Sequence, residues 1–182
     1  MIQRILRIIK LDFSVFREIE SDPSATAQAA IIVAVTTFLS AVGSAIASQN
    51  ALMGFLGSMI SGLVGWVIWS VVTFYVGGSL FKGRGTLDNM LRVLGYASAP
   101  KILGFFRFIC CVGWIPELAG LVLSLIAAIM AIKEGLDLDT GGAIGVAVVG
   151  WIPMMIVHMI LGIIFGGAFA LATGLGRTIT GR

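Results

Sequence analysis

Charged residues are scarce in this sequence. Asp, Glu, Lys and Arg make up only 12% of its 182 residues, against about 25% in a typical soluble domain. None of the four occurs within residues 23–81, 118–132 or 140–176, and the first of these runs is long enough for two membrane spans of about 20 residues each. The mean hydropathy of +1.05 points the same way. The pattern argues against a water-soluble protein and predicts an integral membrane protein.

Residues that carry catalysis or bind metals are also scarce. His158 is the single histidine, and the two cysteines, Cys110 and Cys111, are adjacent, which is not a metal-ligand spacing. The sequence contains no phosphate-binding loop and no zinc-protease motif, and no carboxylate lies at the expected depth of His158 to form a proton relay. We therefore expect no enzymatic activity, no cofactor, no metal and no nucleic-acid partner.

The first 22 residues are expected to form a short amphipathic helix rather than a membrane span. Apolar residues recur at helical spacing with basic residues between them: Ile2, Ile5, Leu6, Ile9, Phe13 and Phe16 alternate with Arg4, Arg7, Lys10 and Arg17. Such a helix suits the headgroup region of a bilayer, on the cytoplasmic side where anionic lipids attract basic residues. The same apolar face would also suit packing on the protein's own bundle, and the sequence leaves both readings open.

Residues 23–176 are expected to form an all-α transmembrane bundle, followed by a short tail at 177–182. Five spans are placed at about 24–47, 52–80, 87–110, 114–132 and 142–172. Helix starts are predicted at Asp22–Pro23, at Thr86, and at Asp139 or Thr140, because these residue types favour N-terminal caps.

The unequal distribution of Lys and Arg predicts the topology. With a cytoplasmic N-terminus, eight basic residues fall on the cytoplasmic side: Arg4, Arg7, Lys10, Arg17, Lys82, Arg84, Arg92 and Lys133. The opposite side has Arg177 and Arg182 in the tail, with Arg107 near it. This bias predicts a cytoplasmic N-terminus and a C-terminus on the other side of the plasma or inner membrane, and hence an odd number of spans. Three spans would require that residues 87–132 do not cross.

The stretch GYASAPKIL lies near the middle of the third expected span. Pro100 has no N–H, so we expect a helix kink that frees the carbonyl of Tyr96. The hydroxyl of Ser98, a water molecule or the ammonium of Lys101 could satisfy that carbonyl. The small residues from Gly95 onward would let another helix approach closely.

Further polar positions lie within the expected spans. Lys101 is expected either to extend its ammonium toward the interface or to line a polar cavity, which His158 could share from a similar depth. Otherwise His158 packs as a core histidine. Arg107 and Glu117 lie at matched distances from the turn between the third and fourth spans, so we expect a structural ion pair between them.

Rows of small residues at four-residue spacing predict close helix packing in lipid. Residues 52–80 contain two such rows, Gly54-Ser58-Gly62 and Gly57-Ser61-Gly65, so this segment is the candidate central helix. A row left exposed would also suit a homo-oligomer.

Three stretches resemble the prokaryotic branch of the Yip1 domain family. They are FREIESDPSATAQA ahead of and into the first expected span, LRVLGYASAPKILG in the third, and AIKEGLDLDTGGAI between the fourth and fifth. The most specific piece is Gly95-Tyr96 followed by small residues and Pro100. The resemblance implies five spans and a cytoplasmic N-terminus. Eukaryotic relatives are implied to bind prenylated Rab GTPases in vesicle traffic, but this chain has only residues 1–22 ahead of the spans and lacks the DLYGP motif, so Rab binding is not carried over.

Two functions are compatible with these features. The leading hypothesis is a non-enzymatic, membrane-organising, trafficking-like or partner-binding scaffold that contacts the lipid bilayer, other membrane proteins or further copies of itself. The alternative is a small permease or channel with a polar cavity around Tyr96, Lys101 and His158.

Overall fold

The computed structural model describes the chain except for residues 48–50, 109–113, 154, 157–158 and 161–182. Every regular element within the described residues is a helix, which confirms the all-α prediction. The elements are α1 (Ile2–Ile9), α2 (Val15–Ser21), α3 (Ala25–Ala47), α4 (Ala51–Phe81), α5 (Leu87–Ala97), the 3₁₀ helix η1 (Ala99–Phe108) and α6 (Trp114–Gly135). A further apolar helix covers Thr140–Pro153.

Three helical segments are long and apolar enough to cross a membrane: Ala25–Gly43, Gly54–Phe81 and Leu118–Gly135. They account for the first, second and fourth expected spans. The fifth, placed at 142–172, is described only in part, because residues 154, 157–158 and 161–172 lie outside the described residues, so the count of five remains a prediction. The third, at 87–110, corresponds to α5 followed by η1.

Pro100 changes the helix type instead of only bending the helix. The α-helix ends at Ala97 with Ser98 as its C-terminal cap, and the chain continues as a 3₁₀ helix in which the N–H of Lys101 donates to the carbonyl of Ser98 at 3.0 Å. A proline cannot donate to the carbonyl four residues earlier, so the shorter-range pattern follows from its position. The hydroxyl of Ser98 donates to the carbonyl of Gly95 at 2.6 Å, while backbone N–H groups at the cap reach the carbonyl of Tyr96. The expectation that the Ser98 or Lys101 side chain would serve Tyr96 is therefore wrong.

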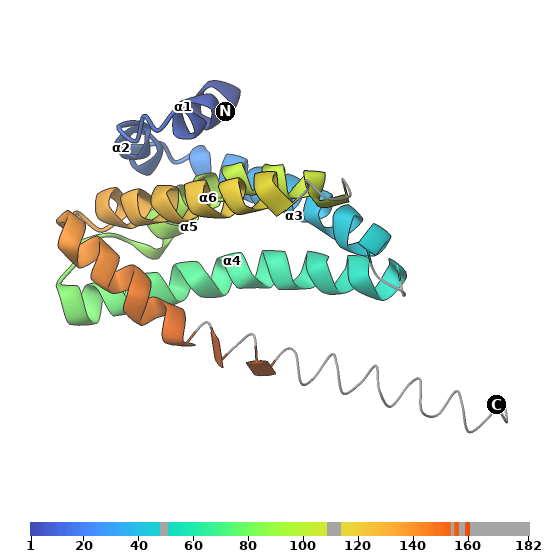
Figure 1. Ribbon diagram of the computed structural model, residues 1–182. Coiled ribbons are helices and arrows are strands. Elements are labelled where there is room, and N and C mark those ends of the chain that lie inside the picture. Colours follow the sequence, from blue (N-terminus) through green and yellow to red (C-terminus); the bar gives the residue numbers. More distant parts are fainter. Residues whose placement is uncertain (48–50, 109–113, 154, 157–158, 161–182) are drawn as a thin grey trace, which may run out of the picture.

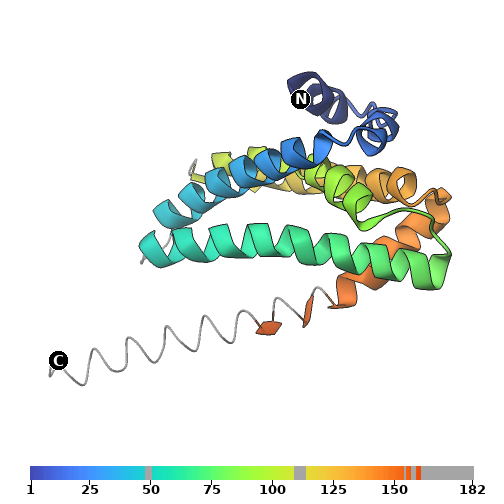
Figure 2. The ribbon, with the colours of Figure 1, turned by 180° about the vertical axis from the view of Figure 1, so that it is seen from behind.

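Within the described part of the chain the central element is α5–η1, not α4. This element packs against both α3 and α6, and residues 92–97 are all buried. In the most apolar part of α4 only 6% of residues are buried, against 39% in α3. Figure 2 shows α4 on the side of the bundle away from α1 and α2. The small residues of α4 were misleading because they show where a neighbour can approach, not how many neighbours there are. A Cβ added at Gly62 would meet the side chain of Thr37, but no described residue lies within 4 Å of one added at Gly57.

Two connecting loops lie side by side at one end of the bundle. The N–H of Arg84, in the α4–α5 loop, donates to the carbonyl of Leu136, after α6, at 2.9 Å. The N-terminal helices lie toward the same end (Figure 1). Thr86 caps α5 by accepting the N–H of Asn89, and Asp139 caps the last helix by accepting those of Gly141 and Gly142. These predicted helix starts are confirmed.

Candidate functional site

The N-terminal segment forms two short helices, not the single amphipathic helix that its periodicity predicted. The chain turns after α1, where Leu11 adopts a left-handed backbone with φ of 63°, and α2 then leads into α3. The apolar side chains of α2, Val15, Phe16 and Ile19, are fully buried, and α2 packs against α5 and α6. This half of the segment therefore belongs to the protein's own core.

Helix α1 carries apolar side chains on two faces, one packed on the bundle and one exposed. Ile8 is buried at 1% exposure and Ile5 packs against the core. Ile2, Leu6 and Ile9, however, remain 68%, 49% and 40% exposed. Their spacing of four and three residues places them on one face of the helix. The sequence left open whether the apolar face of this segment contacts lipid or packs on the bundle, and the two helices differ in this respect. Helix α2 packs on the bundle, and α1 retains an open apolar face.

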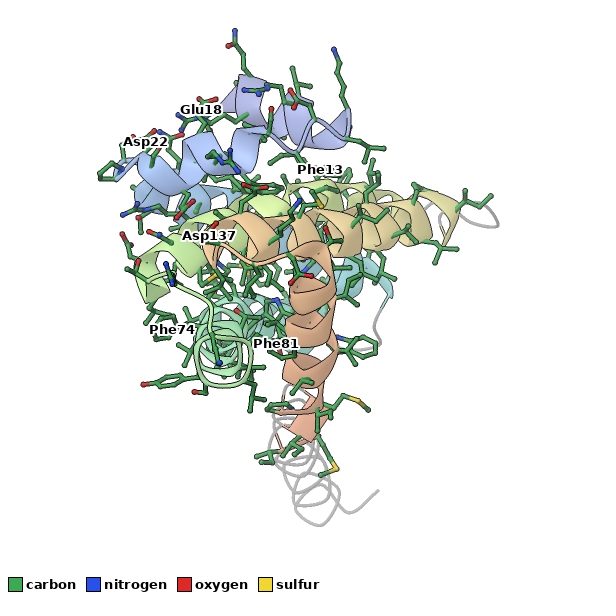
Figure 3. The ribbon with its side chains drawn as sticks, turned by 90° about the vertical axis from the view of Figure 1, so that its left-hand side faces the viewer. Phe13, Glu18, Asp22, Phe74, Phe81 and Asp137 are labelled. Carbon is green, nitrogen blue, oxygen red and sulfur yellow. The ribbon has the colours of Figure 1, made fainter. Side chains whose placement is uncertain are left out.

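Four ion pairs hold α1 against α2 and the start of α3. Arg4 contacts Glu18 at 2.9 Å and Asp22 at 2.7 Å, while Arg7 contacts Asp12 at 2.8 Å and Glu18 at 2.9 Å. Figure 3 shows Glu18 and Asp22 on the flank of the N-terminal helices. The two arginines were expected to face anionic lipid; each also contacts carboxylates of the same chain.

Hydrogen bonds within this cluster shift the pKa values of its carboxyl groups. Those from Ser24 and Arg4 lower the pKa of Asp22 to about 2. The hydrogen bond from Arg4 is the largest cause of a lowered pKa at Glu18, and that from Ser14 lowers the pKa of Asp12. The cluster therefore stays ionised at neutral pH.

A polar cavity of about 310 Å³ lies between α1, α2 and the first turn of α3. Its lining includes both arginines, the carboxylates of Glu18 and Asp22, and Gln28. The hydroxyl of Tyr96, on α5, donates to the amide oxygen of Gln28. Among the described residues no group of three His, Cys, Asp or Glu is arranged to hold a metal ion. The charged and amide side chains of its lining make the cavity suitable for a charged or hydrogen-bonding group.

A second polar cluster surrounds Arg92, which was expected within the third span and was counted only among the cytoplasmic basic residues. Its guanidinium pairs with Asp88 and donates to the hydroxyl of Thr26 at 2.7 Å and to the carbonyl of Glu20 at 2.9 Å. Asn89 donates to the carboxylate of Glu20 at 2.9 Å. The cluster joins α2, α3 and α5. The four-residue spacing of Asp88 and Arg92 was the one signal in the sequence that could have suggested it.

The structure brings some of the predicted site residues together and separates others. Gly95 lies against α3, where an added Cβ would be 2.6 Å from that of Ala29, so the predicted close approach is confirmed. Pro100 is buried, and a Cβ on Gly120 of α6 would be 2.7 Å from its carbonyl oxygen. Lys101 is exposed and is not among the residues that line the polar cavity. The remaining predicted positions, the side chains of Arg107 and Glu117 and the whole of His158, fall outside the described residues.

The three stretches singled out in the sequence meet at this end of the bundle. Arg17, in the first, pairs with Glu134, in the third, at 3.0 Å, and the first stretch contacts the second through Gln28–Tyr96 and Thr26–Arg92. A family model, the Yip1 domain, matches residues 11–164 and so includes all three stretches. No curated protein and no solved structure matches the chain.

Proposed function

This chain belongs to the Yip1 domain family, and on that premise we propose that it is a non-enzymatic membrane protein that organises the bilayer or binds partner membrane proteins through its N-terminal helices. Its apolar helices and its family support the membrane assignment. The working surface in this proposal is α1, together with the part of α3 beside it.

One observation carries the proposal: α1 presents exposed Ile2, Leu6 and Ile9 from a position held by ion pairs. Fully burying such a side chain contributes about 1.5–3 kcal/mol relative to leaving it in water. Covering this face with acyl chains or with a partner is therefore favourable. Because α1 is already folded and anchored, little ordering entropy opposes the contact.

The proposal places the N-terminus on the cytoplasmic side of the plasma or inner membrane and the C-terminus on the opposite side. The bias in basic residues supports this orientation. The gathering of α1, α2, the 82–86 loop and the 136–139 loop toward one end of the bundle is consistent with it. The partners would be lipid, other membrane proteins or further copies of the chain, and not nucleic acid.

The test replaces Ile2, Leu6 and Ile9 together by Ser in the full chain. We expect the variant to lose the effect of the wild type on vesicle size after reconstitution, and to lose the partners captured by crosslinking in native membranes. Leu80→Ser is the control, since Leu80 is an exposed leucine near the end of α4. Vesicle sizes and captured proteins identical to those of the wild type would refute the role of α1.

The alternative of a small permease gains nothing from the position of Lys101, which is exposed and does not line the polar cavity beside Tyr96. A solute flux in liposomes that falls in Lys101→Ala would favour it over the scaffold.

A further inference from the structure

A second cavity adjoins the polar one beneath α1. It is a groove of about 180 Å³ between α1, α3 and η1, and its lining includes Ile5, Ile9, Ile31, Val35 and Ile102. Met1 lines both cavities. On α3, Gln28 faces the polar cavity and Ile31, about one turn further along, faces the groove. The surface therefore changes from charged to apolar within one helical turn.

The polar cavity contains charges of both signs. Arg4 and Arg7 provide guanidinium groups, and Glu18 and Asp22 provide carboxylates. An anion alone would be repelled by the carboxylates, and a cation alone would be repelled by the guanidinium groups. A ligand that carries both charges on one short group can match them together.

We propose that the two cavities form one binding site for a phospholipid with a zwitterionic, amine-bearing headgroup, namely phosphatidylethanolamine. The phosphate faces Arg4 and Arg7, the ammonium faces Glu18 and Asp22, and one acyl chain occupies the groove. Guanidinium groups bind phosphate oxygens through charge-assisted hydrogen bonds, and an ammonium with free N–H groups does the same with carboxylates.

The bilayer can supply this lipid directly. Ile31 and Val35 line the groove and are also among the half-exposed apolar side chains on the outer face of α3. An acyl chain can therefore enter sideways without leaving an apolar environment. The inference rests on the proposed interfacial position of α1, but its test measures bound lipid rather than vesicle shape or partner capture, so either proposal can fail without the other.

The test uses the full chain in nanodiscs that contain equal amounts of phosphatidylethanolamine, phosphatidylcholine and phosphatidylglycerol. Native mass spectrometry of the released protein identifies any retained lipid by mass. We expect phosphatidylethanolamine to be retained several-fold more than either of the others, because phosphatidylcholine lacks ammonium N–H groups and phosphatidylglycerol lacks the positive charge. Equal retention of the three lipids, or no retained lipid, would overturn the proposal, and this comparison needs no variant.

A pair of valine substitutions then locates the site. Val35→Trp fills the groove and should reduce retained phosphatidylethanolamine several-fold. Val67→Trp is the matched control, because Val67 on α4 is 45% exposed, close to the 48% of Val35, but does not line the groove. Circular dichroism checks that both variants keep the helical content of the wild type. Equal lipid retention by two folded variants would place the lipid elsewhere.

Discussion

The hydroxyl of Tyr96 on α5 donates a hydrogen bond to the side-chain amide oxygen of Gln28 on α3. The tyrosine is fully buried, and Gln28 also lines the polar cavity beneath α1. One hydrogen bond thus connects the central helix of the bundle to the surface that we propose as functional.

Tyr96→Phe should destabilise the folded protein by about 1 kcal/mol, because it removes one intramolecular hydrogen bond and leaves the Gln28 oxygen without its donor. Thermal unfolding in detergent measures the effect. Tyr75→Phe is the control, since Tyr75 is exposed on α4. An equal change in unfolding temperature for the two variants would contradict a stabilising role for the Tyr96 hydrogen bond.

Gly95→Ala should destabilise by about 1–3 kcal/mol, because the added methyl group would lie 2.6 Å from the Cβ of Ala29 and force α5 away from α3. Gly57→Ala is the matched control: in the part of the chain that the structure describes, nothing lies within 4 Å of an added Cβ there, and replacing a helical glycine by alanine is favourable by up to about 1 kcal/mol. The double variant Gly95→Ala, Ala29→Gly should recover part of the loss in unfolding temperature. If it recovers none, the contact with Ala29 is not the cause.

Asp22 should make the stability of the N-terminal helices depend on pH in the acidic range. Its pKa in the folded protein, about 2, lies below its ordinary value of 3.8, because Ser24 and Arg4 hydrogen-bond the carboxylate. A lowered pKa stabilises the folded state above the ordinary value, and that contribution disappears as the pH falls from 3.8 through about 2.

Asp22→Asn removes this contribution, so the wild type should have the higher unfolding temperature at pH 6. The two unfolding temperatures should converge as the pH approaches 2. Fluorescence-detected unfolding in detergent at a series of pH values measures the difference. A gap that stays constant with pH would show that the carboxylate charge is not responsible.

Arg92→Ala should cost about 1.5–3 kcal/mol, because the buried guanidinium donates charge-assisted hydrogen bonds to Thr26 on α3 and to the carbonyl of Glu20 on α2, and both are lost. Arg17→Ala, by contrast, should cost at most about 1 kcal/mol. Arg17 also pairs with a carboxylate, that of Glu134, but its side chain is 81% exposed, and exposed pairs contribute little. Chemical unfolding of both variants tests the contrast, and similar losses would contradict it.

Local chemistry explains what the sequence predicted correctly. The helix starts at Thr86 and Asp139 depend on side chains that bond backbone groups two or three residues away, and the break at Pro100 depends on a missing N–H. The membrane class follows from uncharged runs whose transfer into lipid is favourable in any fold. The small residues around Gly95 indicated a close approach without naming the partner, Ala29.

The sequence alone thus determined that the protein resides in a membrane, that it is helical, and where several helices begin and end. These features depend on neighbours along the chain. The tertiary structure alone decided that α1 folds back over α2, that Arg92 lies in a buried cluster, and that α5–η1 rather than α4 is central. Those features depend on pairs such as Thr26 with Asp88 and Arg17 with Glu134, which are 62 and 117 residues apart. Such pairs form only when packing brings distant segments together, and the periodicity of a single helix has no information about its partner.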